Sequence, residues 1–269
     1  MKILKTISIF ILLNFLSINV LNASSSIVLK NDKESILSLG MEMSNMRNIL
    51  KSYIQIGAQL SHGNPTQTLK DGIVHYENLL EALKIKYPNN PTIQESIKTS
   101  KVAWVEVKKA MELSLTDISL EEMKKGAIFI HGNIRTVIKE LALMKKDLLQ
   151  SSDISNKEAL NASMEIAASA HRLSAHYMMD LWHLDDPTID KHWNKGLSIY
   201  ADSIEILQNS PYIENQEFKE LLQNCKKRHV YFTKMGKKAR IYSILIDRKA
   251  TIVFNNAKRM TQIILESNN

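Results

Sequence analysis

Two stretches of the sequence, 69–83 (LKDGIVHYENLLEAL) and 193–207 (WNKGLSIYADSIEIL), decide the fold class. In each stretch apolar residues recur at i, i+4, i+7, i+11 and i+14, which places them on one face of an α-helix. The second stretch lies 124 residues after the first, and a glycine stands fourth in each, at Gly72 and Gly196. The chain therefore contains one amphipathic helical pattern twice.

The repetition continues on both sides of these stretches. Four sets of matching positions follow one another in the same order in both halves, at offsets of 123 to 125 residues. One set consists of Arg47, Ile49 and Tyr53 in the first half and His171, Leu173 and Tyr177 in the second. Differences of one residue in offset are what changes in loop length produce. We interpret the pattern as an internal duplication.

Each half contains four helical stretches. We expect them at 32–61, 66–85, 91–114 and 118–150, and at 155–184, 187–209, 214–232 and 236–266. Long outer helices with shorter middle ones suit an up-down-up-down four-helix bundle. The predicted fold is therefore all-α, with two tandem four-helix bundles at 30–151 and 155–267. If the last helix of the first bundle continued almost directly into the first helix of the second, the two bundles would form a rod.

The composition excludes several classes of protein. Glycine and proline number only 8 and 5 of 269 residues, too few for the many turns of a β-sandwich or barrel. The single cysteine excludes a disulfide framework, a multi-cysteine zinc or iron–sulfur site, and covalent c-type haem. The sequence has no nucleophile elbow, glycine-rich phosphate loop or zinc-protease helix, so we expect a protein that is not an enzyme.

The first 25 residues have the features of a secretory signal peptide. Two lysines come first, an apolar stretch spans 7–21, and small residues follow at 23–25. The apolar stretch is shorter than the about 20 residues that a spanning helix needs, although an uncleaved anchor is the alternative. We predict export to the periplasm. Export argues against nucleic acid as the partner of this basic chain, whose formal charge is +7.

Cations on the leading helix of each half are the candidate ligand-binding residues. Arg47 and Lys51 lie four residues apart, in a run (43–53) that contains no acid. In the second half His171 takes the place of Arg47, and Arg172 and His176 follow. A guanidinium group at a seam between bundles is suited to bind a small oxyanion, because its planar fork matches two oxygens. The alternative is a set of exposed cations.

Two other sites remain as alternatives. His176, Asp180 and His183 have the i, i+4, i+7 spacing of one helical face and, with His192, suggest metal or non-covalent haem. No E-x-x-H pair accompanies them, which favours a solvated or interfacial polar face, and we assign no metal and no cofactor. The segment 226–240 carries seven cations and no acid, which suits either a structural adaptor for an acidic partner or membrane surface, or a solubilising helix end.

The second half carries HRLSAH at 171–176, and the first half carries RNILKS at 47–52. With the signal segment and the tandem four-helix units, these elements resemble the PilJ/NarX-type extracytoplasmic sensor domain. That domain is the N-terminal domain of type IV pili methyl-accepting chemotaxis transducers and occurs in nitrate/nitrite sensor kinases. The family pattern is R-M-L-S-Q-R. The second half keeps its leucine and serine with histidines at both arginine positions, and the first half keeps only the first arginine, Arg47.

The resemblance covers roughly residues 30–267 and implies an all-α module that binds a ligand without transforming it. In nitrate-responsive members the leading-helix arginine binds the oxyanion. The resemblance also implies a membrane receptor or sensor kinase as partner, and a homodimer, for which two copies in one chain can substitute as an intrachain pseudo-dimer. Family receptors continue into a second span and an output domain, whereas this sequence ends at Asn269. We therefore expect a stand-alone copy that binds a small anion or a receptor.

Overall fold

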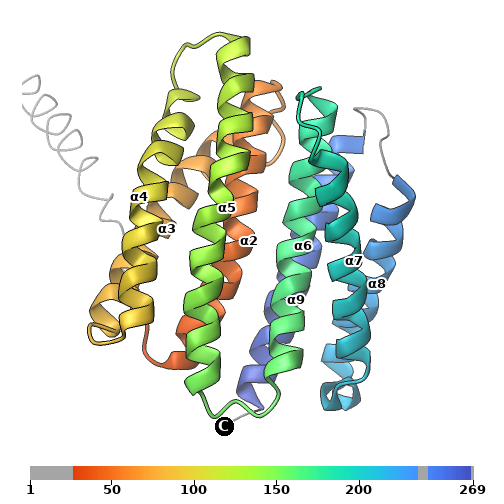
Figure 1. Cartoon of the computed structure of the whole chain (residues 1–269). Helices are drawn as coiled ribbons and strands as arrows, with labels where there is room; N and C mark the ends of the chain where they lie inside the picture. The colour runs from red at the N-terminus through yellow and green to blue at the C-terminus, as the bar shows by residue number, and fades with distance from the viewer. Residues whose placement is uncertain (1–26, 236–241, 268–269) are drawn as a thin grey trace, which may run out of the picture.

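The computed structural model describes residues 27–235 and 242–267, and the regular structure in these two ranges is entirely helical (Figure 1). The prediction of an all-α fold is confirmed. The signal segment and residues 236–241 of the last expected helix lie outside the described residues. The helices are α2 (Asp32–Gly57), α3 (Pro65–Lys86), α4 (Pro91–Leu113), α5 (Leu120–Ser151), α6 (Lys157–Leu181), α7 (Ile189–Gln208), the short 3-10 helix η1 (Pro211–Glu214), α8 (Gln216–Met235) and α9 (Ser243–Glu266).

Side-chain caps explain where several of these helices begin. Asn31, Asn90 and Asn156 each accept a hydrogen bond from the backbone N–H three residues further on. Ser119 and Glu122 form a reciprocal capping box at the start of α5. These bonds satisfy donors that the first turn of a helix leaves without an intrahelical partner. Asparagine and serine residues just before the apolar stretches thus mark where these four helices begin.

The helices form two four-helix units that lie side by side. Helices α2–α5 make up the first unit and α6–α9 the second, and consecutive helices run in opposite directions (Figure 1). α2 packs along α6, and it also contacts α9. Because the chain turns back between α5 and α6, the expectation of a rod is wrong. None of the described helices combines the length and the apolar character needed to cross a membrane.

The seam between α2 and α6 is narrow because small residues occupy it. Gly40 of α2 faces Met164 of α6 so closely that an added Cβ would stand 2.0 Å from the methionine sulfur. α6 is also rich in small buried residues: Ala159, Ala162, Ser163, Ala167, Ala168, Ser169, Ala170, Ser174 and Ala175. The apolar residues of both units consequently form one continuous core. A polar side chain on this seam is largely removed from water.

The two glycines that mark the repeat make equivalent contacts. A Cβ on Gly72 would stand 2.5 Å from Cγ1 of Ile49, on the leading helix of the first unit. A Cβ on Gly196 would stand 3.2 Å from Cδ2 of Leu173, on the leading helix of the second unit. Ile49 and Leu173 are themselves equivalent in the sequence repeat. Each glycine therefore allows the second helix of its unit to approach the first.

Aromatic contacts recur in the same way. In the first unit the ring centroids of Tyr76 and Trp104 lie 4.5 Å apart. In the second unit those of Tyr200 and His229, at the matching positions, lie 5.0 Å apart. Two kinds of contact therefore repeat at the spacing found in the sequence, which supports an internal duplication.

The close approach at Gly72 gives a prediction with a matched control. Gly72→Ala is expected to lower the free energy of unfolding by about 1–3 kcal/mol, because the new methyl group overlaps the buried, β-branched Ile49. Gly132→Ala, on α5 with no atom within 4 Å of the new Cβ, is expected to raise it by about 0.5–1 kcal/mol through helix propensity. Urea denaturation measures both. Stabilisation by both variants would contradict the packing described.

Candidate functional site

A cavity of about 320 Å³ lies along one side of the seam, between α2, α5, α6 and α7. We call it the cationic cavity. Its lining includes the acid Glu165 and a larger number of cations and imidazoles: Arg47, His131, Arg135, Lys139, Arg172, His176, His192 and Lys195. Three of the predicted site residues, on two different helices, thus face one space.

Arg47 is deeply buried in this cavity. It is 9% exposed, and its Nη1 donates a hydrogen bond to the backbone oxygen of Met43 at 2.7 Å. Among the described residues no carboxylate lies within ion-pair distance of its guanidinium group. Burial and then the charge of Arg172 lower the pKa of Arg47 to about 9, against an opposing effect of Glu165. The protein therefore holds a poorly solvated cation next to a like charge.

Arg172 reaches the same cavity from α6. Its Nη1 is buried and has no hydrogen-bond partner in the described part of the chain. Burial lowers its pKa, and Glu165 again has the opposite effect. Glu165 also lies 4.0 Å from the ammonium group of Lys145, which donates to Asn161 at 2.7 Å. One carboxylate is thus shared among three cations, and the arginines keep unused capacity to bind negative charge.

Three imidazoles complete the wall. His131 Nδ1 lies 2.7 Å from Oδ2 of Asp186, and His176 Nδ1 lies 2.7 Å from the backbone oxygen of Arg172. The Nε2 atoms of these two histidines are 3.2 Å apart. The ring of His192 lies 5.6 Å from each of the other two, centroid to centroid. Helices α5, α6 and α7 each supply one ring.

Burial disfavours the charged form of all three imidazoles. Burial is the main cause that lowers the pKa of His176 to about 3 and that of His192 to about 4. Burial also lowers the pKa of His131, although the hydrogen bond to Asp186 acts in the opposite direction. The arginines and lysines, and not the histidines, therefore give the cavity its positive charge.

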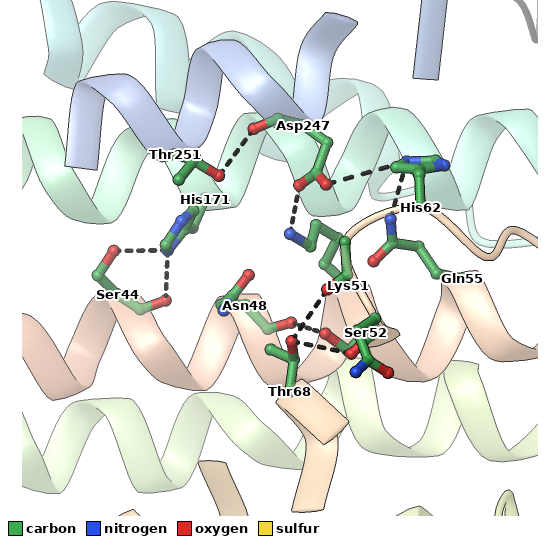
Figure 2. Close-up of polar contacts among 12 residues, drawn as sticks. Ser44, Asn48, Lys51, Ser52, Gln55, His62, Thr68, His171, Asp247 and Thr251 are labelled. Carbon is green, nitrogen blue, oxygen red and sulfur yellow. Dashed lines mark hydrogen bonds and ion pairs between the residues drawn. The ribbon is translucent and has the colours of Figure 1, made fainter. Parts of the chain in front are cut away.

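The two remaining predicted residues, Lys51 and His171, lie on the other side of the seam (Figure 2). Lys51 forms a buried ion pair with Asp247 of α9. The other carboxylate oxygen of Asp247 lies 3.9 Å from Nε2 of His62, which contacts Gln55 at 3.0 Å. Lys51 is therefore engaged by an acid and does not line the cationic cavity.

His171 is held by neutral partners. Its Nδ1 lies 3.0 Å from the hydroxyl oxygen of Ser44, and its ring stacks on Phe254 at 4.9 Å between centroids. Burial is the main cause that lowers its pKa to about 3. The structure thus separates His171 from Arg47, its equivalent in the repeat, and gives it the contacts of a core residue.

The repeat relates the two sides of the seam. At offsets of 123 or 124 residues, Arg47, His131, His176 and His192 correspond to His171, Phe254, Ser52 and Thr68. Several of these counterparts appear together in Figure 2. One side of the seam therefore carries the cationic cavity. The equivalent positions on the other side carry smaller or neutral residues, and an internal ion pair lies among them.

The predicted helical face of His176, Asp180 and His183 is wrong. α6 ends at Leu181, and His183 lies beyond it, exposed, in a left-handed conformation with φ 54°. Asp180 and His176 do lie together, because both line a second cavity of about 470 Å³. In the described ranges no three histidine, cysteine or acidic side chains are placed to hold a metal ion.

The basic segment 226–240 is only partly described. Lys226 and Lys227 are exposed on α8, whereas residues 236–241 lie outside the described part of the chain. Cys225, next to them, is fully buried, and burial is the main cause that raises the pKa of its thiol to about 12. Thr233 of this segment lines a cavity of about 470 Å³, and the buried Cys225 next to the segment is not placed as a reactive thiol.

Sequence reasoning missed His131 as a site residue, and it did not predict that Asp186 contacts His131. His131 stands on the buried face of α5, among Ala127, Ile130 and Ile134. A histidine on an otherwise apolar row is the signal that was available. Its partner Asp186 comes from the loop after α6, and nothing in the spacing of the two residues indicates that they meet.

In comparisons with protein families, curated proteins and solved structures, no match to this chain is found. The resemblance to the PilJ/NarX-type domain therefore stays a prediction, and the function has to be argued from the geometry above.

Proposed function

We propose that this protein binds a small oxyanion in the cationic cavity, at the seam between its two four-helix units. One observation carries the proposal. Arg47 is buried, Arg172 is half-buried, and both line one cavity; among the described residues no carboxylate is ion-paired with Arg47, and the buried Nη1 of Arg172 has no hydrogen-bond partner. In the part of the chain that the structure describes, Glu165 is the one acid in the lining of this cavity, and it is shared with Lys145, so it does not balance the charge of both arginines.

An anion would reverse the unfavourable electrostatics of this cavity. Buried guanidinium groups lose hydration, and two of them repel one another. An oxyanion between them would supply acceptors and negative charge together, which gives short, charge-assisted hydrogen bonds. Arg135, Lys139 and Lys195 are exposed at the cavity and would draw anions toward it from solvent.

We further propose that the protein acts as an exported, non-enzymatic module of sensor type. The signal-like first 25 residues and the leading-helix elements of the sequence support this proposal. Contact between the two leading helices suits an intrachain pseudo-dimer. The partner would be a membrane receptor or a sensor kinase. Binding of an anion to this protein would change its interaction with that partner. Co-purification from a membrane extract, with and without anion, tests this part separately.

Isothermal titration with phosphate, sulfate, nitrate and acetate tests anion binding. We expect at least one of these anions to bind the wild type with one-to-one stoichiometry. Arg172→Gln is expected to weaken that binding about 10-fold or more, because it removes a charge-assisted donor. Arg259→Gln is the control, since Arg259 lies outside the cavity and pairs with Glu217 and Glu266 at the surface.

Two results would contradict the proposal. The first is the absence of heat with every anion of the set. The second is equal weakening by Arg172→Gln and Arg259→Gln, which would indicate a diffuse surface effect of positive charge.

A further inference from the structure

The contacts of two cavity histidines fix which ring nitrogen carries hydrogen. His176 Nδ1 points at a backbone oxygen of Arg172, and a carbonyl oxygen only accepts, so this nitrogen must donate. His131 Nδ1 points at Asp186, whose pKa is lowered by hydrogen bonds from Thr188 and His131 although burial opposes them. That carboxylate is ionised and accepts as well. In the neutral form of each ring, which burial favours, the remaining nitrogen, Nε2, is therefore a hydrogen-bond acceptor.

Two neutral rings that both donate through Nδ1 present their Nε2 lone pairs to one another. The Nε2 atoms of His131 and His176 are 3.2 Å apart, and both residues line the cationic cavity. Nη2 of Arg135 makes a long, weak hydrogen bond of 3.5 Å to the Nε2 of His131. Buried acceptors without a donor are costly. The cavity thus offers an acceptor at His176 and a weakly engaged acceptor at His131, beside the unused Nη1 donor of Arg172.

This inference rests on the oxyanion binding proposed above and names the class of ligand. We propose that the cationic cavity selects oxyanions that carry a hydroxyl proton, such as hydrogen phosphate. The hydroxyl would donate to Nε2 of His131 and His176, and the unprotonated oxygens would accept from the guanidinium groups. Nitrate and sulfate have no hydroxyl at neutral pH, so one of their oxygens would face two lone pairs.

A metal ion or an additional proton could also occupy the space between the Nε2 atoms of His131 and His176. Each would add positive charge to a cavity that already contains Arg47, Arg135, Arg172 and Lys195. A hydroxyl group adds none and arrives with the negative charge of its anion. The electrostatics of the cavity therefore favour the hydroxyl.

Asp186 has a positioning role in this scheme. Its Oδ1 accepts from the backbone N–H and the hydroxyl of Thr188, at 2.8 and 2.7 Å, which leaves Oδ2 directed at His131. The acid therefore fixes the ring orientation and the hydrogen on Nδ1. Without it, His131 could present Nε2–H to the cavity and the preference for a hydroxyl would weaken.

Titration of the full chain with phosphate and with sulfate at pH 8 tests the inference. At this pH both are mainly tetrahedral dianions, and phosphate carries one hydroxyl that sulfate lacks. We expect phosphate to bind at least about 100-fold more tightly, because sites built to pair a hydroxyl reject analogues without one. Sulfate binding as tight as that of phosphate would overturn the inference and leave the proposed function standing. No binding of any anion would remove the proposed function itself.

His131→Phe is the informative variant, because the second half carries Phe254, a partly buried ring, at the equivalent position. We expect the phosphate-to-sulfate preference to fall to near one, with sulfate affinity retained. An unchanged preference would overturn the inference. Phosphate binding that is lost after dialysis against EDTA and restored by Zn²⁺ would also overturn it, in favour of a bridging metal ion. The wild-type comparison of the two anions decides the question even if the variant is poorly folded.

Discussion

Asp247→Asn is expected to lower the free energy of unfolding by about 3–5 kcal/mol. Asp247 and Lys51 are both buried, and their ion pair joins α9 of the second unit to α2 of the first (Figure 2). Asparagine keeps the volume of the side chain but removes its charge. The ammonium group of Lys51 would then be buried without a counter-charge, and its desolvation would no longer be offset.

Guanidinium denaturation of the variant, followed by circular dichroism, measures this loss. The double variant Lys51→Met/Asp247→Leu is the control, because it removes both charges and fills the space with apolar groups. We expect its stability to be at or above that of the wild type. An Asp247→Asn variant as stable as the wild type would show that this ion pair is not buried as described.

Arg47→Met is expected to have two effects of opposite sign. In the absence of anion it should raise the free energy of unfolding by about 1–4 kcal/mol, because a buried cation is replaced by an apolar side chain of similar length. The variant should also bind the anion at least about 10-fold more weakly, since the charge-assisted hydrogen bonds of the guanidinium are lost. A residue kept for function at a cost in stability shows this combination.

Thermal unfolding with and without phosphate separates the two effects. The wild type should gain stability as phosphate is added, because a ligand that binds only the folded state stabilises it. Arg47→Met should begin with a higher midpoint and gain less. A lower midpoint of Arg47→Met in the absence of anion would mean that Arg47 is structural and would contradict the binding role.

Most of the fold was predictable because the decisive information is local. The apolar periodicity at 69–83 and 193–207 places two helices, and asparagine or serine caps place the starts of others. The relative position of the units was not predictable from these signals. It depends on the match of Gly40 to Met164 and on the small residues of α6, which are meaningful only when both helices are in place.

The candidate site was predictable in part for the same reason. Arg47 and Arg172 stand out as cations on leading helices without acids nearby in sequence, and both line the cavity. Lys51 also stands out, but its acid is 196 residues away on α9, so sequence spacing could not reveal the pair. The pairing of His131 with Asp186 joins α5 to a loop of the other unit, and it too requires the tertiary arrangement.

Anomalous diffraction from a crystal of this protein soaked in arsenate tests the central claim most directly. Arsenate has the shape and the hydroxyl of phosphate, and its arsenic atom can be located without ambiguity. The account predicts one strong peak in the cationic cavity, with arsenate oxygens within hydrogen-bond distance of both Arg47 and Arg172. A cavity without a peak, in a crystal where arsenate is found only on exposed lysines, would contradict it.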